Sequence, residues 1–438
     1  MDKVILTPCG EISGTDSNID GVIAFKGIRY ARTERWQYPE IVSSWQGTYD
    51  ATAYGNCSYQ PRTFYNEEEN PGKIFYYNEF RKGETYKYDE DCLFLNIWTP
   101  EYAEKDSKLP VLVYIHGGGF TGGCGHEKHF DGPLWAKKGV VAVTINYRLG
   151  PMGFACLPEL KDEAGHTGNY GLYDQMTAIQ WVKNNISAFG GDENKITIMG
   201  QSAGAMSVQH LCQSDLTDGL FCSAVMSSGV SLGSFMTSTP EKKYDFWKEV
   251  MAACGCSNLE QLRKVSPEEL FKAWKQTKGS GMSAAPVKDG LLIKENAKPK
   301  KIPYMVGATS HDMAPAFLQP MTKNWGKKND AYVWHFARML PGDDKGAWHS
   351  SDLWYWFGTL KNCWRPMCEK DYALSDEMTT YLCNFVKSGN PNGGNLPEWK
   401  KCTDSKSVMI FSDNDTKMGK VNMGKLVVTT MTNKPVGE

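Results

Sequence analysis

The clearest chemical signal in the sequence is a serine placed between two glycines. The run from Ile196 to Gly204 reads Ile-Thr-Ile-Met-Gly-Gln-Ser-Ala-Gly, so Ser202 follows an apolar stretch and precedes a helix-compatible one. Gly-x-Ser-x-Gly between a strand and a helix is the pattern of a nucleophile elbow, which presents a serine hydroxyl to a carbonyl carbon. We expect Gly200 and Gly204 to leave room across the turn, where a Cβ atom would collide. The helix that follows would place free N–H groups beside developing negative charge.

A run of glycines ends an earlier apolar stretch. Pro110 to Phe120 reads Pro-Val-Leu-Val-Tyr-Ile-His-Gly-Gly-Gly-Phe. Three glycines after a buried strand let backbone N–H groups converge on a ligand oxygen, as an oxyanion hole requires. A phosphate-binding loop is the alternative, but the run lacks the Gly-Lys-Ser/Thr ending, and the next lysine is Lys128. The run therefore favours an oxyanion hole.

A serine nucleophile needs a histidine that accepts its proton. Chains with this elbow carry serine, acid and histidine in that order, which excludes the histidines before Ser202. His210 lies on the same predicted helix as Ser202 and cannot turn back to the elbow. His335 lies in a strand-like run, and His311 has no acid at a predicted strand end between itself and Ser202. His349 lies in a loop-like stretch, where catalytic groups are common, and is favoured as the base.

The acid that orients this histidine is expected just after the end of a strand. Asp312 follows the predicted strand 302–306 at a short distance and satisfies that condition. Asp289, Asp343 and Asp344 remain alternatives that spacing alone does not exclude.

The elements that must position these residues are typical of an open α/β sheet. Continuous apolar runs at 111–115, 140–145, 196–199 and 302–306 predict strands that are buried on both faces, as in a parallel sheet. Helical spacing at 173–185, which ends at Phe189-Gly-Gly, completes a strand–helix–strand unit. The sequence therefore predicts an α/β fold with a central, mostly parallel, twisted sheet flanked by helices.

The flanking regions differ from this core. Apolar runs at 22–25 and 93–98 predict antiparallel strands at the N-terminal edge of the sheet. Residues 63–87 are rich in Tyr, Glu, Asn and Lys and read as a long surface excursion. Amphipathic patterns at 245–253 and 267–274 predict inserted cap helices within about 240–300. No linker divides the chain, so residues 1–438 are expected to form a single domain.

Composition excludes several classes of function. The 438 residues carry 48 basic and 50 acidic side chains, a net charge of −2 that gives no reason to expect nucleic acid as a partner. No run is long and apolar enough to span a membrane, and the N-terminus lacks the apolar core of a secretion signal. The oligomeric state is left open.

The thirteen cysteines show no CxxC pair. Together with the missing secretion signal, this predicts reduced thiols and a cytoplasmic location. Because no pair has the spacing of common zinc-ligand sets, no metal site is expected. The chemistry outlined above implies no organic cofactor either.

The sequence resembles the type-B carboxylesterase family, which includes cholinesterases and non-catalytic adhesion homologues. The resemblance implies an α/β-hydrolase fold. The segments that carry it follow in order along most of the chain: Phe25–Ala31, Glu90–Pro100, His116–Phe120, Asn146–Arg148, Gly168–Gln175, Phe189–Asp192, Met226–Gly229, Gly346–His349 and Gly389–Asn392.

The resemblance implies a role for each site residue. It makes Ser202 the nucleophile, His349 the base and Asp312 the orienting acid. The N–H groups of the oxyanion hole would come from Gly118, Gly119 and Ala203. It further implies a buried serine at Ser228 beside the site and a structural ion pair between Arg35 and Glu90.

The sequence departs from the family pattern at three places. Many relatives have glutamate followed by glycine where this chain has Asp312 and Met313. Gln201 stands where many have glutamate before the serine, which is not expected to abolish activity. Secreted relatives often pair cysteines like Cys57 and Cys92, which would stay thiols in a reducing cytoplasm.

The predicted function is hydrolysis of carboxylic esters through an acyl-enzyme on Ser202. Trp348, Trp354, Tyr355, Trp356 and Trp364 lie near the predicted base. Most are expected in the core, and some in an apolar pocket for small or aromatic esters. The alternatives are amide or carbamate hydrolysis by the same residues, or a non-catalytic binding homologue on the same fold.

Overall fold

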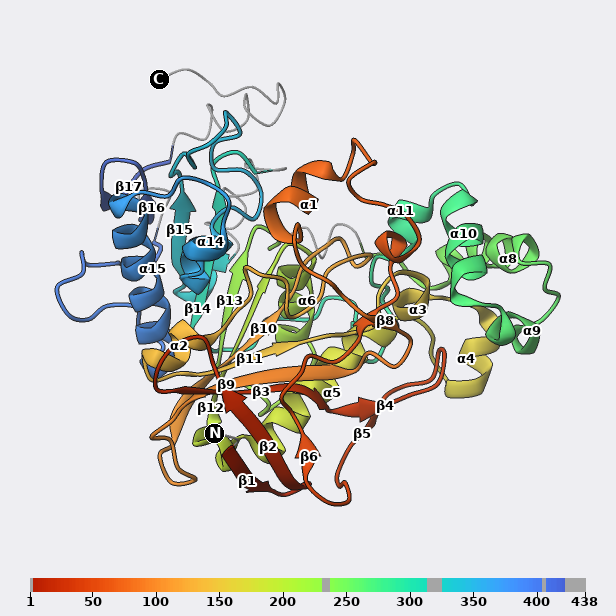
Figure 1. The fold of residues 1–438 in the computed structure, drawn as a ribbon. Helices are drawn as coiled ribbons and strands as arrows, with labels where there is room; N and C mark the ends of the chain where they lie inside the picture. The colour runs from red at the N-terminus through yellow and green to blue at the C-terminus, as the bar shows by residue number, and fades with distance from the viewer. Residues whose placement is uncertain (1–2, 231–236, 313–324, 404–406, 422–438) are drawn as a thin grey trace.

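One large sheet forms the centre of the computed structural model, which describes residues 3–230, 237–312, 325–403 and 407–421 (Figure 1). Its strands follow the order β1-β2-β3-β9-β11-β10-β12-β13-β14-β15-β16-β17, with β6 paired to β2. Neighbouring strands from β11 to β16 are parallel, so their carboxyl ends share one edge. The bounds are β1 Lys3–Thr7, β2 Gly10–Asp16, β3 Val22–Arg29, β6 Tyr49–Asp50, β9 Phe94–Pro100, β10 Leu109–Ile115, β11 Val141–Ile145, β12 Gly191–Gln201, β13 Ser223–Ser227, β14 Tyr304–Thr309, β15 Tyr332–Phe336, β16 Val408–Phe411 and β17 Thr416–Gly419.

The central strands carry long apolar runs because both faces of the sheet are covered. Along β10, Val111, Val113 and Ile115 point into one hydrophobic cluster. Leu112 and Tyr114, which alternate with them, point into a second cluster on the opposite face. Successive side chains of a strand point to opposite faces, so a strand between two helical layers needs an unbroken apolar run. The predicted α/β class with a mostly parallel sheet is confirmed.

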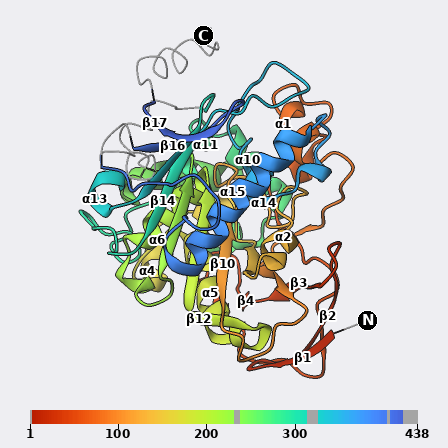
Figure 2. The ribbon, with the colours of Figure 1, turned by 90° about the vertical axis from the view of Figure 1, so that its left-hand side faces the viewer.

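Helices form the two outer layers. Apolar residues of α5 (Tyr170–Asn185) and α6 (Ala203–Cys212) belong to the first cluster. Those of α2 (Pro133–Lys137), α14 (Leu353–Phe357) and α15 (Glu369–Ser388) belong to the second, and Figure 2 shows α15 passing in front of the sheet. Outside residues 240–300, the other helices of the described residues are short: α1 Ile74–Phe80, α3 Gly150–Phe154, α4 Pro158–Ala164, α13 Lys327–Asn329, and the 3₁₀ turns η1 Pro61–Phe64, η2 Ile186–Phe189, η3 Asp215–Thr217 and η6 Leu360–Asn362.

The two predicted N-terminal strands, β3 and β9, are antiparallel to each other, as the sequence predicts. β3 pairs with β9, and β9 pairs with β11, at the edge of the parallel region. Two small sheets accompany them, β4 (Ala31–Arg32) with β5 (Glu40–Ile41) and β7 (Cys57–Ser58) with β8 (Tyr88–Asp89).

Helices also occupy the predicted insertion, as α8 (Glu241–Ala253), α9 (Leu259–Lys264), α10 (Pro267–Gln276) and α11 (Ser280–Ser283). α10 begins with a capping box, in which Ser266 and Glu269 satisfy each other's backbone N–H groups. The apolar faces of α8, α9 and α10 join a third cluster that includes Ala203 and Met206 of α6, directly after the elbow. None of the helices in the described ranges is both long and apolar enough to cross a bilayer.

Two predictions about elements need correction. The predicted strand 302–306 begins two residues later, at Tyr304, because Pro303 has no N–H to donate and contributes only its carbonyl oxygen, to Ala224 N–H. The prediction that region 63–87 is a surface excursion is wrong. The region contains α1, and Glu79, Phe80 and Arg81 are buried. Its buried charges are paired, with Arg365 Nη2 2.6 Å from Glu79 Oε1, which is why its polar composition misleads.

Candidate active site

Ser202 occupies a sharp turn between β12 and α6. β12 ends at Gln201, α6 begins at Ala203, and Ser202 has φ 55° and ψ −125°. This region is costly for a residue with a Cβ atom and persists where the surroundings enforce it. Here the Ser202 N–H donates to Ser227 O at 2.9 Å, which ties the turn to the end of β13. The hydroxyl therefore stands at the carboxyl edge of the sheet and at the N-terminus of a helix.

The two glycines of the elbow leave room across the turn, as the sequence predicts. A Cβ atom on Gly200 would lie 2.3 Å from the backbone of Gly204, and one on Gly204 would lie 2.1 Å from Ile115 O. No side chain fits at such distances, so the close packing of α6 against β10 and β12 requires glycine at both positions.

The glycine segment after β10 runs beside this turn because β10 and β12 are neighbours in the sheet. A Cβ atom on Gly117 would lie 3.0 Å from Ser202 Cβ. Gly118 has φ +106°, where a Cβ atom would lie 2.0 Å from Gly122 O, so only glycine is tolerated. The N–H groups of Gly118, Gly119 and Ala203 donate to no backbone carbonyl among the described residues. These donors are free to bind an oxygen atom.

The fold brings His349 and Asp312 into contact. His311 N–H, just beyond β14, donates to Ala347 O at 3.0 Å, and His311 forms a parallel bridge with Trp348. The next residue in each segment is then adjacent, and His349 Nδ1 lies 2.7 Å from Asp312 Oδ1. Burial lowers the pKa of His349, but the adjacent Asp312 carboxylate outweighs it, so the pKa lies above its ordinary value.

The other ring nitrogen of His349 faces Gln201. Gln201 Nε2 lies 3.2 Å from His349 Nε2, and because Nδ1–H donates to Asp312, the amide donates to the imidazole lone pair. Ser202 Oγ makes no hydrogen bond within the described parts of the chain. In the absence of substrate such bonds are often open. Gln201 therefore competes with Ser202 for the lone pair of His349.

Replacing Gln201 with glutamate tests this contact. A carboxylate beside the imidazole stabilises its charged form, so we expect the acid limb of the kcat/KM profile to move up by about one pH unit. The sign follows because only neutral His349 accepts a proton. Hydrolysis of p-nitrophenyl acetate from pH 5 to 9 measures the limb. Gln213→Glu, the same change at the other end of α6, is the matched control, and equal limbs in the two variants would contradict the assignment.

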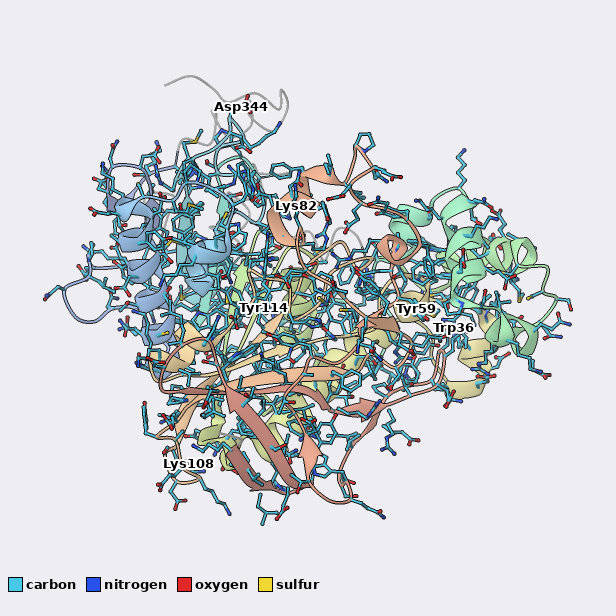
Figure 3. All side chains as sticks on the ribbon, in the orientation of Figure 1. Trp36, Tyr59, Lys82, Lys108, Tyr114 and Asp344 are labelled. Atoms are coloured by element: carbon cyan, nitrogen blue, oxygen red, sulfur yellow. The ribbon has the colours of Figure 1, made fainter. Side chains whose placement is uncertain are left out.

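The alternative residues lie elsewhere. Asp343 pairs with Arg365 at 2.7 Å, and Asp289 accepts from Tyr173 Oη at 3.0 Å. Asp344 is exposed at the outer edge of the molecule, whereas Tyr114, two residues before His116, lies near its centre (Figure 3). His335 is buried on β15 as predicted, and burial lowers its pKa to about 4.

A second carboxylate near His349 has no counterpart in the sequence predictions. Asp352 is fully buried, and burial raises its pKa to about 6. Its Oδ2 accepts from Ser227 Oγ at 2.8 Å and from Trp356 Nε1 at 3.2 Å. Ser228 is buried as the resemblance implies, but it is Ser227 that reaches the carboxylate. The only sequence signal for a role of Asp352 was its close spacing to His349.

Ser202 and His349 line one cavity of about 400 Å³. The glycine segment and the residues after it line another part, and region 63–87 supplies aromatic surface through Tyr65, Tyr76 and Phe80. None of the aromatic residues 348, 354, 355, 356 and 364 lines it. The first four are core residues, and Trp364 is half exposed, so the expectation that some of them form a substrate pocket is wrong. Charged side chains are present too, and Arg62 and Glu127 among them pair at 2.6 Å.

Two further expectations concern side chains outside the cavity. Arg35 and Glu90 form the predicted ion pair, with Nε 2.9 Å from Oε2. Cys57 and Cys92 are free thiols, as are the other cysteines.

Comparison with known proteins adds independent information. A sequence profile described as the carboxylesterase family matches residues 1–323 and 316–427. The para-nitrobenzyl esterase of Bacillus subtilis (strain 168) is 38% identical over 278 residues, which cover 62% of this chain and 52% of that protein. Carboxylesterase 5A of Canis lupus familiaris is 33% identical, over 93% of this chain and 85% of that protein.

Solved structures agree in fold. An esterase from anaerobic Clostridium hathewayi, described as able to hydrolyse aliphatic aromatic polyesters, superposes with a TM-score of 0.79 at 26% identity, over 94% of each chain. This likeness confirms the predicted α/β-hydrolase fold. The chain nevertheless spans only about half the length of the Bacillus subtilis relative.

Proposed function

The chain belongs to the carboxylesterase family, and we propose that it hydrolyses small carboxylic esters through an acyl-enzyme on Ser202. One observation carries this proposal: Ser202 and His349 line the same cavity, and Asp312 accepts a hydrogen bond from Nδ1 of His349. A nucleophile, a base and a group that orients the base are the parts that acyl transfer needs.

In the proposed mechanism, His349 Nε2 accepts the Ser202 proton as Oγ attacks the ester carbonyl carbon. Asp312 holds the ring orientation and stabilises the imidazolium. The oxyanion is bound by the N–H groups of Gly118, Gly119 and Ala203. His349 then protonates the leaving alcohol, and water repeats the two steps on the acyl-enzyme.

Before attack, the Gln201 amide must leave the lone pair of His349. We attribute this displacement to the bound ester, which positions Ser202 Oγ to transfer its proton to His349.

We further propose that the preferred esters have short acyl chains and an aromatic part. A cavity of about 400 Å³ lies near the lower end of small-molecule sites, and Tyr65, Tyr76 and Phe80 supply aromatic surface. The names of two relatives support an aromatic component, para-nitrobenzyl esters for one and aliphatic aromatic polyesters for the other.

A panel of p-nitrophenyl acetate, butyrate and decanoate measures the acyl preference. We expect kcat/KM not to rise from butyrate to decanoate, because methylenes that extend beyond the cavity lose the roughly 0.8 kcal/mol that burial gives each one. A steady rise with chain length would overturn the proposal.

Tyr76 tests the aromatic part of the proposal. Tyr76→Ala should lower kcat/KM for phenyl acetate more than for ethyl acetate, whereas Tyr102→Ala, at a 68% exposed tyrosine that does not line the cavity, should change neither. Equal losses on both esters would contradict an aromatic subsite.

We also propose that the protein works in the cytoplasm. All thirteen cysteines are free thiols in the structure, and most are buried, which suits a reducing compartment.

A further inference from the structure

Two thiols and an imidazole meet beside the glycine segment. Cys57 lies on β7, and Cys124 and His126 follow the turn that begins at His116. The ligand atoms of Cys57, Cys124 and His126 all lie within 4.8 Å of one another. Both cysteines are buried, and His126 is half-buried. None of these side chains has a role in the proposed ester hydrolysis.

The spacing fits a tetrahedral metal site. With Zn–S near 2.3 Å and Zn–N near 2.05 Å, tetrahedral geometry sets S···N at about 3.6 Å and S···S at about 3.8 Å. Cys57 Sγ lies 3.5 Å from His126 Nε2, which matches the first of these separations. A cation at the centre of the three atoms therefore needs little movement of Cys57 or His126.

The surroundings hold the ligands in place. The His126 ring stacks on Tyr54, with centroids 4.5 Å apart and planes within 8°. Cys57 N–H donates to Lys87 O at 2.7 Å, and Gly123, next to Cys124, donates its N–H to Gln60 Oε1 at 2.9 Å. His126 Nδ1 is buried without a hydrogen-bond partner in the described structure, so no hydrogen bond at that atom explains the ring's position.

The two arginines near the cysteines, Arg62 and Arg81, are paired with carboxylates. Arg62 lies 2.6 Å from Glu127, and Arg81 lies 2.6 Å from Glu67 and 3.5 Å from Glu127. These two arginines and two glutamates cancel in net charge.

We propose that Cys57, Cys124 and His126 form a binding site for Zn²⁺. Two sulfur ligands and one imidazole suit this ion, and solvent would complete the fourth position. Binding would release the thiol protons and fasten the end of the glycine segment to β7. The sequence predicted no zinc site because local spacing was the criterion. Cys57 is 67 positions from Cys124 and 69 from His126, and only the fold brings it to them.

The test uses full-length protein made metal-free and kept reduced. Titration with Co²⁺ should produce thiolate-to-cobalt charge-transfer absorption that saturates at about one ion per chain and disappears when Zn²⁺ is added. Cys57→Ser, Cys124→Ser and His126→Gln should each weaken Zn²⁺ binding by more than the roughly 10- to 100-fold that loss of a supporting hydrogen bond causes. Circular dichroism shows whether each variant is folded.

The matched control is Cys156→Ser, which removes a buried thiol from another part of the fold and should leave the titration unchanged. If the wild type shows no charge-transfer band, or if folded variants bind Zn²⁺ as tightly as the wild type, the site does not exist. Neither result bears on ester hydrolysis, which Ser202→Ala tests separately.

Discussion

Replacement of Ser202 with alanine is expected to lower kcat for p-nitrophenyl acetate by about 10⁴- to 10⁶-fold. Without Oγ no acyl-enzyme forms, and only the oxyanion donors and the bound geometry remain to assist attack by water. The fold should survive, because alanine keeps the Cβ atom that the strained turn accommodates and leaves the Ser202 N–H bond to Ser227 intact. Steady-state kinetics and thermal unfolding measure the two properties.

The control for this variant is Ser207→Ala on the same helix. Ser207 Oγ donates to Ala203 O at 3.0 Å and does not line the cavity, so its loss should change kcat little. If Ser202→Ala retained more than a small fraction of the wild-type rate, hydrolysis would have to proceed without the proposed nucleophile.

Asp312→Asn is expected to lower kcat by about 10³- to 10⁴-fold. An asparagine can hold the wrong tautomer of His349 and cannot stabilise the imidazolium that forms during attack. The carboxylate also raises the pKa of His349, so its removal should move the acid limb of the residual kcat/KM profile to lower pH. The loss of rate and the shift of the limb are measured on the same ester.

Asp344→Asn is the matched control, since Asp344 is exposed and away from the cavity. Asp343→Asn breaks a pair with Arg365 and should affect stability more than rate. A large loss of kcat in either control, with Asp312→Asn near wild type, would reassign the orienting acid.

The sequence was most informative where a site depends on short-range geometry. Gly200, Ser202 and Gly204 specify the elbow because the collisions that they avoid occur within one turn and its two neighbouring strands. The continuous apolar run before His116 likewise specifies a doubly covered strand, since the period of a strand is local.

Contacts between distant segments were harder to predict, because local spacing left Asp289, Asp343 and Asp344 as alternatives to Asp312 and only the family resemblance selected it. Asp312 reaches His349 because His311, just beyond β14, forms a backbone bridge with Trp348. The polar composition of 63–87 concealed the pairing of Glu79 with Arg365, 286 residues away, and with it the aromatic wall of the cavity. Conversely, Trp354 and Trp356 are near His349 in sequence but point into the core.

The proposal that Ser202 is the nucleophile is tested most directly by a fluorophosphonate, whose phosphorus is attacked by an activated serine. Intact-mass and peptide analysis of the full-length protein should show one adduct per chain, located on Ser202. Labelling should be absent in Ser202→Ala and much slower in His349→Ala. A folded wild-type protein that takes up no label, or carries it on another residue, would contradict the account.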